Sequence, residues 1–155
     1  MTRRALSDLI RKLLERDSDR ISTARAVVDA IRQKGAYRWA GLYDVDAQDG
    51  VVSNIAWSGA GAPEHPTFPI TKGLTSRAIK EKKTINVGDV TRDPDYLTAL
   101  ATTRSEIIVP VVDVAHNSVI GTIDVESELH NAFDSVTQKE LEECAIVLRR
   151  FWRRF

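Results

Sequence analysis

Two apolar segments in the last third of the chain carry three acidic residues. The first reads Arg104-Ser105-Glu106-Ile107-Ile108-Val109-Pro110, and the second reads Gly121-Thr122-Ile123-Asp124-Val125-Glu126-Ser127. β-Branched residues dominate both segments, as is typical of strands, and Ala115-His116-Asn117-Ser118 between them has the composition of a turn. The two segments therefore predict an antiparallel hairpin, and the fold is expected to contain a β-sheet.

Strand geometry brings the three acids of this hairpin together. Asp124 and Glu126 are two residues apart, so they point to the same face of their strand. A turn between the segments places Glu106 across from Glu126. Three converging carboxylates repel one another and need a cation, an ammonium-bearing ligand or protonation to be stable. In the alternative interpretation the acids face water, or Arg77 and Arg104 neutralise them.

Apolar residues at helical spacing predict helices at both ends of the chain. Residues 5–15 predict a first amphipathic helix, and a second follows with an apolar stripe from Ile21 to Ile31. Asp17-Ser18-Asp19 offers N-caps between them, and Gly35 suits the left-handed position at the end of the second helix. A last helix is expected from Ser135-Val136-Thr137-Gln138, which has capping-box spacing.

Alternating and β-branched stretches predict the remaining sheet. The expected strands cover residues 37–45, 51–57, 68–70, 84–87, 106–114 and 119–127. A further helix is expected to start near Gly73. Residues 88–104 are polar and irregular, with a helical turn expected from Asp93 to Leu100, and this loop is the expected lid. The order predicts an α+β fold, an antiparallel six-stranded sheet with the N- and C-terminal helices packed on one face.

The bulk composition sets the class of protein. The 155 residues suit a single domain (1–155), with residues 1–16 as an N-terminal amphipathic helix and residues 17–155 as the core. Lys plus Arg and Asp plus Glu both number 22, so the formal net charge of zero gives no reason to expect nucleic acid or membrane as a partner. No apolar run approaches the roughly 20 residues of a membrane helix. A cytoplasmic protein is expected.

Other candidate sites are weaker. Three histidines lie at scattered loop or turn positions without metal-ligand spacing, so no metal site and no cofactor are expected; they are His65, His116 and His130. Four arginines near the C-terminal end are expected to form the solvated flank of a helix, and the alternative is contact with nucleic acid or anionic lipid. They are Arg149, Arg150, Arg153 and Arg154.

The element order and the acidic hairpin resemble the GAF domain family over roughly residues 20–150. Within that family the chain is most similar to the free methionine-R-sulfoxide reductase branch. Trp39-Ala40-Gly41-Leu42-Tyr43 resembles the Trp-x-Gly-Phe-Tyr of the first strand of that branch. Asn131-Ala132-Phe133-Asp134 resembles the Gly-Arg-Phe-Asp that leads into its last helix. The resemblance implies a small-molecule sensor fold.

The resemblance also implies a ligand site on the acidic hairpin. In that branch a Ser-Glu pair and an Asp-x-Asp-Ser stretch hold the ammonium group and polar head of an amino acid. The matching positions here are Ser105, Glu106, Asp124, Glu126 and Ser127. Glu126 stands in place of an Asp, which lengthens the side chain by one methylene and narrows the site.

Aromatic residues complete the expected pocket. Trp39, Tyr43 and Tyr96 are expected to supply its apolar wall. The alternative for Trp39 and Tyr43 is that they are core residues on one face of a strand. The ligand class expected first is an amino acid or a derivative of one.

The redox centre of the reductase branch is missing. Its chemistry needs one thiolate to attack the sulfoxide and a second thiol to resolve the product. The matching positions carry Thr75 and Ala99, which cannot do this chemistry. The single cysteine, Cys144, lies on the apolar stripe of the last helix and is expected to be an inert core thiol, with a reactive or intermolecular thiol as the alternative. No catalytic residue is therefore expected.

Three functions remain open on this evidence. The first is a small-molecule-binding sensor or regulatory domain that passes its signal to a separate protein. The second is a divergent free methionine-R-sulfoxide reductase, and the third is a ligand-free dimeric scaffold. A homodimer through the terminal helices is expected, and the alternative is that the first helix packs along the last within one chain.

Overall fold

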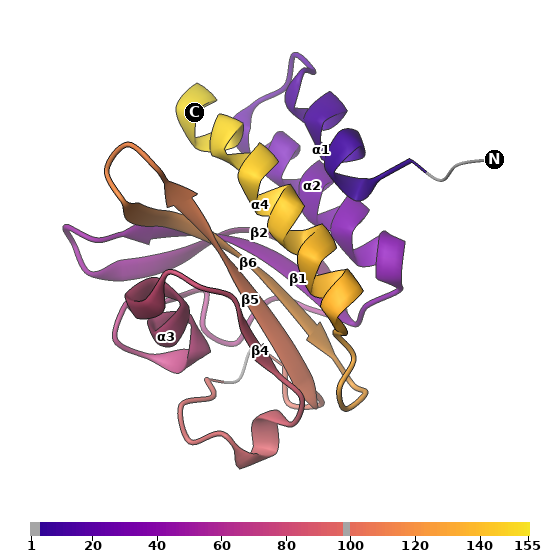
Figure 1. Cartoon of the computed structure of the whole chain (residues 1–155), viewed down its shortest axis with the longest axis vertical. Coiled ribbons are helices and arrows are strands. Elements are labelled where there is room, and N and C mark those ends of the chain that lie inside the picture. Colours follow the sequence, from indigo (N-terminus) through magenta and orange to yellow (C-terminus); the bar gives the residue numbers. More distant parts are fainter. Residues whose placement is uncertain (1–3, 98–99) are drawn as a thin grey trace.

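A six-stranded antiparallel sheet organises the chain, with helices on both of its faces (Figure 1). The computed structural model describes residues 4–97 and 100–155. The strands run β3-β2-β1-β6-β5-β4 across the sheet. In chain order the elements are α1 (Leu6–Leu14), α2 (Arg20–Gly35), β1 (Trp39–Asp46), β2 (Val51–Gly59), β3 (Thr67–Pro69), α3 (Gly73–Glu81), β4 (Ile85–Val87), the 3-10 helix η1 (Val90–Arg92), β5 (Ser105–Asp113), β6 (Ser118–Ser127) and α4 (Ser135–Arg154).

The terminal helices cover one face of the sheet and α3 covers the other (Figure 1). The main core lies between the sheet and α2 and α4, and it includes Ile123 and Val125 of β6. Because side chains alternate along a strand, Asp124 and Glu126 point to the opposite face, toward α3. The expected fold class is confirmed, and this two-sided covering is what buries the acidic hairpin.

The first helix packs within its own chain. Its apolar stripe is buried against α2 and α4, through Leu6, Ile10, Leu13 and Leu14. Arg154 at the end of α4 donates to the carbonyl oxygens of Leu14 (2.7 Å) and Ser18 (3.0 Å). The alternative of packing within one chain is thus the arrangement observed. Burying this stripe does not require a second copy, and the homodimer stays a prediction.

α2 ends at Gly35 and α4 begins at Ser135, as expected, but the expected capping residue at each of these ends is wrong by one position. The left-handed residue after α2 is Ala36 (φ 51°, ψ 40°), whose N–H bonds back to the helix. Gly35 has a different role, because a Cβ there would lie 2.1 Å from Cζ of Tyr37. At α4 the N-cap is Asp134, which accepts from the N–H of Thr137 at 2.8 Å, and Ser135 is already helical.

The expected helical turn from Asp93 onward is also wrong over the described residues. A single 3-10 turn, η1, comes earlier and is capped by Asp89, which accepts from the N–H of Thr91 at 3.1 Å. Asp93 is extended (φ −99°, ψ 118°) because it precedes Pro94, and a residue before proline is disfavoured in the helical region. The chain therefore leaves η1 as an irregular segment.

In the described part of the chain, no helix combines the length and the hydropathy that a bilayer span requires.

Candidate functional site

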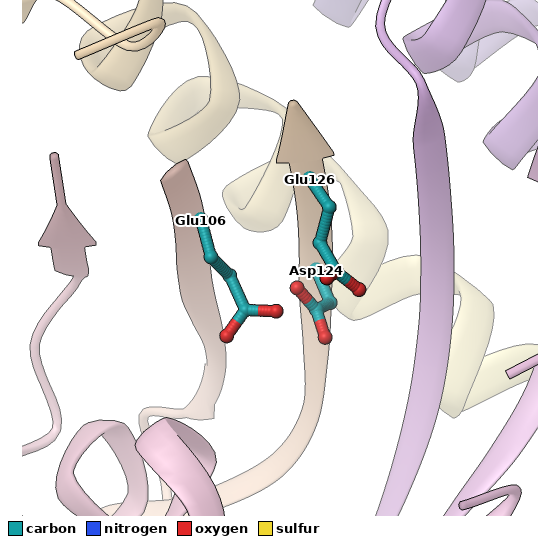
Figure 2. A group of neighbouring side chains, drawn as sticks. All are labelled: Glu106, Asp124 and Glu126. Carbon is teal, nitrogen blue, oxygen red and sulfur yellow. The ribbon is translucent and has the colours of Figure 1, made fainter. Parts of the chain in front are cut away.

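Glu106, Asp124 and Glu126, called here the acidic triad, converge on the α3 face of the sheet. Glu106 on β5 is the register partner of Glu126 on β6, and Asp124 lies one pleat away on the same face. One carboxylate oxygen from each residue lies within 4.8 Å of the others. Figure 2 shows the three side chains pointing toward one another from the two neighbouring strands. The predicted convergence is thus present in the structure.

The acidic triad is buried and incompletely hydrogen-bonded. The three residues are only 3%, 6% and 0% exposed. Oε1 of Glu126 accepts from the hydroxyl of Thr103 at 2.7 Å and from that of Tyr96 at 3.2 Å. Oδ1 of Asp124 and Oε2 of Glu126 are buried without a hydrogen-bond partner. Buried polar atoms of this kind are rare and call for an explanation, such as a missing ligand or a proton.

The two arginines considered as neutralising partners lie elsewhere. Arg77 forms ion pairs with Asp93 and, at 3.5 Å, with Asp95. Arg104 is exposed, and its guanidinium donates to the carbonyl oxygen of Thr103 at 3.3 Å. Over residues 4–97 and 100–155, no salt bridge involves the acidic triad. Both alternatives, solvent exposure and neutralisation by arginine, are therefore wrong in this structure.

Burial shifts the acid–base properties of the site. Burial, followed by repulsion from the neighbouring acids, raises the pKa of Glu106 and of Asp124 well above their ordinary values. Burial also raises the pKa of Glu126, to about 7, while the hydroxyls of Thr103 and Tyr96 act in the opposite direction by donating to it. The site therefore favours neutral carboxyls unless a positive charge enters.

A small cavity adjoins the acidic triad. Its volume is about 20 Å³, close to what one ordered water needs. Glu106 and Asp124 form one side, and the first turn of α3 forms another, including Thr75, which the sequence resemblance matches to a cysteine. The complete lining is Tyr43, His65, Phe68, Gly73, Leu74, Thr75, Leu97, Glu106 and Asp124. A ligand larger than water would have to displace part of this lining.

β1 supplies an aromatic wall beside the acids. Trp39 and Tyr43 are 0% and 3% exposed, with ring centroids 6.4 Å apart, and they flank Gly41. A Cβ on Gly41 would lie 2.3 Å from the Trp39 ring, so the missing side chain lets the indole lie across the strand. Gly41 is the register partner of Asp124. Both aromatics expected on β1 therefore lie on the triad's face of the sheet.

The third expected aromatic, Tyr96, has a polar contact. Its hydroxyl donates to Glu126, and burial raises the pKa of this hydroxyl so that it stays protonated. Sequence reasoning missed its companion Thr103, which is 2% exposed and donates to the same oxygen. It also missed His65, Phe68 and other lining residues. No pattern in the sequence connects these residues with the acidic hairpin.

The two expected serines lie apart from the acidic triad. Ser105 donates to the carbonyl oxygen of Leu129 at 2.6 Å and accepts from the N–H of Ala132 at 3.3 Å. Ser127 accepts from the N–H of Leu129 at 3.1 Å. Strand alternation turns both serines to the α4 face, where they fix the loop after β6. The structure does not bring Ser105 and Ser127 together with the three acids.

The structure gives no thiol at the pocket among the described residues. Cys144 is 0% exposed in the core beneath α4, and burial raises the pKa of its thiol to about 12. Such a thiol holds almost no reactive thiolate at neutral pH. Ala99, the other expected cysteine position, lies outside the described residues. Within the described residues, the acidic triad is the one group of three or more His, Cys, Asp and Glu side chains arranged closely enough to share a cation.

Comparison with known proteins identifies relatives of the whole fold. The GAF domain family model matches residues 19–149. The chain is 27% identical to GAF domain-containing protein A of Dictyostelium discoideum over 139 residues, which cover 86% of this chain and 82% of that protein. It is 28% identical to the free methionine-R-sulfoxide reductase of Saccharomyces cerevisiae over 113 residues, 72% of this chain and 61% of that protein.

Similarity to a free methionine-R-sulfoxide reductase is also found by comparison with solved structures. The free methionine-R-sulfoxide reductase from Neisseria meningitidis, determined in complex with its substrate, superimposes with a TM-score of 0.84 and 26% identity. The match covers 95% of this chain and 86% of that one.

Proposed function

The chain belongs to the GAF domain family, and on that premise we propose that it is a regulatory domain that binds a small cationic ligand at the acidic triad. An amino acid or amino-acid derivative is the ligand class to test first. The observation that carries the proposal is the pair of buried oxygens without partners, Oδ1 of Asp124 and Oε2 of Glu126. An ammonium group supplies the donors and the positive charge that these oxygens lack.

The surrounding residues support an organic ligand. Trp39 and Tyr43 provide a buried aromatic wall beside the carboxylates, and Phe68 and Leu74 add apolar surface. Small-molecule sites typically combine such apolar walls with a few converging polar groups. The relatives that are free methionine-R-sulfoxide reductases act on an amino-acid derivative, which is consistent with this ligand class.

A divergent reductase is the second candidate, and the similarity to the reductases named above favours it. Against it, the sequence holds a single cysteine, Cys144, buried in the core on the α4 side of the sheet. Thr75 lines the cavity where the family places a thiol. A two-thiol cycle cannot run within these residues, so binding without reduction is the simpler function. Reduction of methionine sulfoxide that survives Cys144→Ser would reverse this preference.

Assembly is a separate part of the proposal. A homodimer through the terminal helices would use what α1 and α4 still expose, including Leu9 at 37% and Phe155 at 40% exposure. A separate signalling protein would then receive the ligand-dependent signal. Sedimentation with and without ligand tests the first point.

A thermal-shift titration tests the proposed binding. The panel holds the free amino acids, both methionine sulfoxide epimers and, as anionic comparison, cyclic nucleotides. A ligand at 100 times its Kd should stabilise the fold by about 2.7 kcal/mol. Asp124→Asn should abolish the shift, whereas Asp29→Asn, an exposed position on α2, should retain it. If no amine-bearing compound stabilises the protein, the ligand-free scaffold becomes the better description.

A further inference from the structure

The acidic triad has too few neutralising groups to be fully ionised without a ligand. Two hydroxyl donors, Thr103 and Tyr96, reach it, and both donate to the same oxygen of Glu126. Oδ1 of Asp124 and Oε2 of Glu126 are buried and receive no donor from the protein. Three negative charges within 4.8 Å of one another would repel strongly in such a dry site.

The charged and titratable groups nearest the triad lie on β1, on α3 and on the segments after β2 and before β5. Tyr43 of β1 and Tyr96 of the loop before β5 are phenols that burial keeps neutral. His65, after β2, is half-buried and lines the same cavity as Glu106. Arg77 of α3 pairs with Asp93 and Asp95, and Arg104, just before β5, is exposed and donates to a backbone carbonyl oxygen.

We infer that the acidic triad exchanges protons for the positive group of its ligand. Without ligand the three carboxyls share at least one proton, which stands between their oxygens in place of a cation. When a cationic group enters, that proton leaves to the bulk solvent and the carboxylates pair with the ligand. The inference deepens the proposed function, on which it rests for the cationic ligand, and adds its regulation by pH.

The small size of the cavity favours exchange of a proton for the ligand over binding of the ligand without proton release. Its volume of about 20 Å³ leaves no room for a positive group together with its hydration shell. The incoming cation must therefore lose its water and find carboxylates that are ready to replace it. Affinity should rise about tenfold per pH unit for each proton released, until the triad is ionised in the free protein.

The first arm of the test needs no ligand. Infrared spectroscopy at pH 7 distinguishes the carbonyl stretch of a neutral carboxyl from that of a carboxylate. The ligand-free wild type should show a neutral carboxyl band that weakens in Glu106→Gln and in Asp124→Asn and persists in Asp29→Asn. A wild-type spectrum at pH 7 with no neutral carboxyl band would overturn the inference.

The second arm counts protons. Calorimetric titration of L-methionine sulfoxide and of methylammonium, in two buffers of different ionisation enthalpy at one pH, measures the protons released on binding. Release of about one proton or more is expected, and it should fall in Glu106→Gln. His65→Gln should leave it unchanged; loss of release in that variant would assign the proton to the imidazole and overturn the inference.

The outcomes separate the two proposals. Binding of a probe without proton release would overturn the exchange and leave the proposed function standing. Failure of every amine to bind would reject the proposed function, and with it the exchange of protons for ligand, whatever the spectra of the free protein show.

Discussion

Glu106 on β5 and Glu126 on β6 are direct register partners, and their side chains are 3% and 0% exposed on the same face of the sheet. Like charges placed opposite each other destabilise a strand pair. Burial adds a second cost, because an ionised carboxylate loses its hydration. A sequence selected for stability alone would place apolar residues here, as it does at Ile107 and Val125 on the other face. The proposed binding of a cationic ligand would offset both costs.

The stability of the ligand-free protein should fall as pH rises. A carboxyl whose pKa is higher in the folded than in the unfolded state binds more protons when folded. Its contribution is therefore fully present below the unfolded value near 4.5 and is lost as pH rises through the folded value, about 7 for Glu126. Between about pH 5 and pH 8 the loss from this residue should be on the order of 3 kcal/mol. Urea denaturation across this window measures it.

Glu126→Gln provides the comparison for this pH profile. The amide keeps the shape and cannot ionise, so the profile should flatten and the variant should exceed wild type in stability near pH 8. Glu81→Gln, at an exposed position on α3, should reproduce the wild-type slope. If the wild-type protein instead became more stable from pH 5 to pH 8, the carboxylates would have to be ionised in the folded state, with their charges balanced by positive or hydrogen-bonding groups.

Thr103 should hold Glu126 in its charged form. Its hydroxyl donates to Oε1 of Glu126 at 2.7 Å, which lowers the pKa of the carboxyl relative to burial alone. Thr103→Val keeps the shape and removes the donor, at a cost of about 1 kcal/mol. The midpoint of the stability profile should move to higher pH. Thr102→Val, at an exposed neighbouring position, should leave the midpoint unchanged. An unchanged midpoint in Thr103→Val would show that the Thr103 hydroxyl does not affect the ionisation of Glu126.

The acidic triad was predictable because strand alternation and pairing follow simple rules. The two-residue spacing of Asp124 and Glu126 fixes their common face, and one turn sets the partner of Glu106. The same alternation puts Ser105 on the face opposite Glu106, whereas the family resemblance placed both residues in the ligand site. The strand pattern and the resemblance therefore make the same prediction for the three acids and different predictions for Ser105.

The donor Thr103 and the lining residue His65 were not predicted from the sequence, and Tyr96 was expected through the family resemblance alone. All three residues lie in irregular segments, whose positions depend on tertiary contacts and not on a repeating backbone geometry. The residues that cap the helices were also hard to predict, because they too depend on tertiary contacts. Ala36 takes the left-handed position because the helix continues through Gly35, where the Tyr37 ring excludes a Cβ.

Gly121 on β6 should be needed for the docking of α4. A Cβ there would lie 2.0 Å from the Trp152 ring, whose Nε1 donates to Asp44 at 2.8 Å. Gly121→Ala should cost about 1–3 kcal/mol, because the ring must move and the hydrogen bond is strained. Denaturation followed by tryptophan fluorescence measures the loss. Gly61→Ala is the matched control, since a Cβ there meets nothing within 4 Å; equal stability of the two variants would contradict the packing argument.

Arg77 should stabilise the position of residues 93–97, the segment that places Tyr96 beside the acidic triad. Its guanidinium on α3 pairs with Asp93, which is 14% exposed at its side chain, and lies 3.5 Å from Asp95. Because the Arg77 side chain is itself 38% exposed, Arg77→Ala should cost under about 1 kcal/mol of global stability. Locally, hydrogen exchange of residues 93–97 should accelerate and ligand dissociation should speed up. Arg92→Ala removes a more exposed ion pair to Asp89 and should change neither; equal exchange in the two variants would show that other contacts hold the segment.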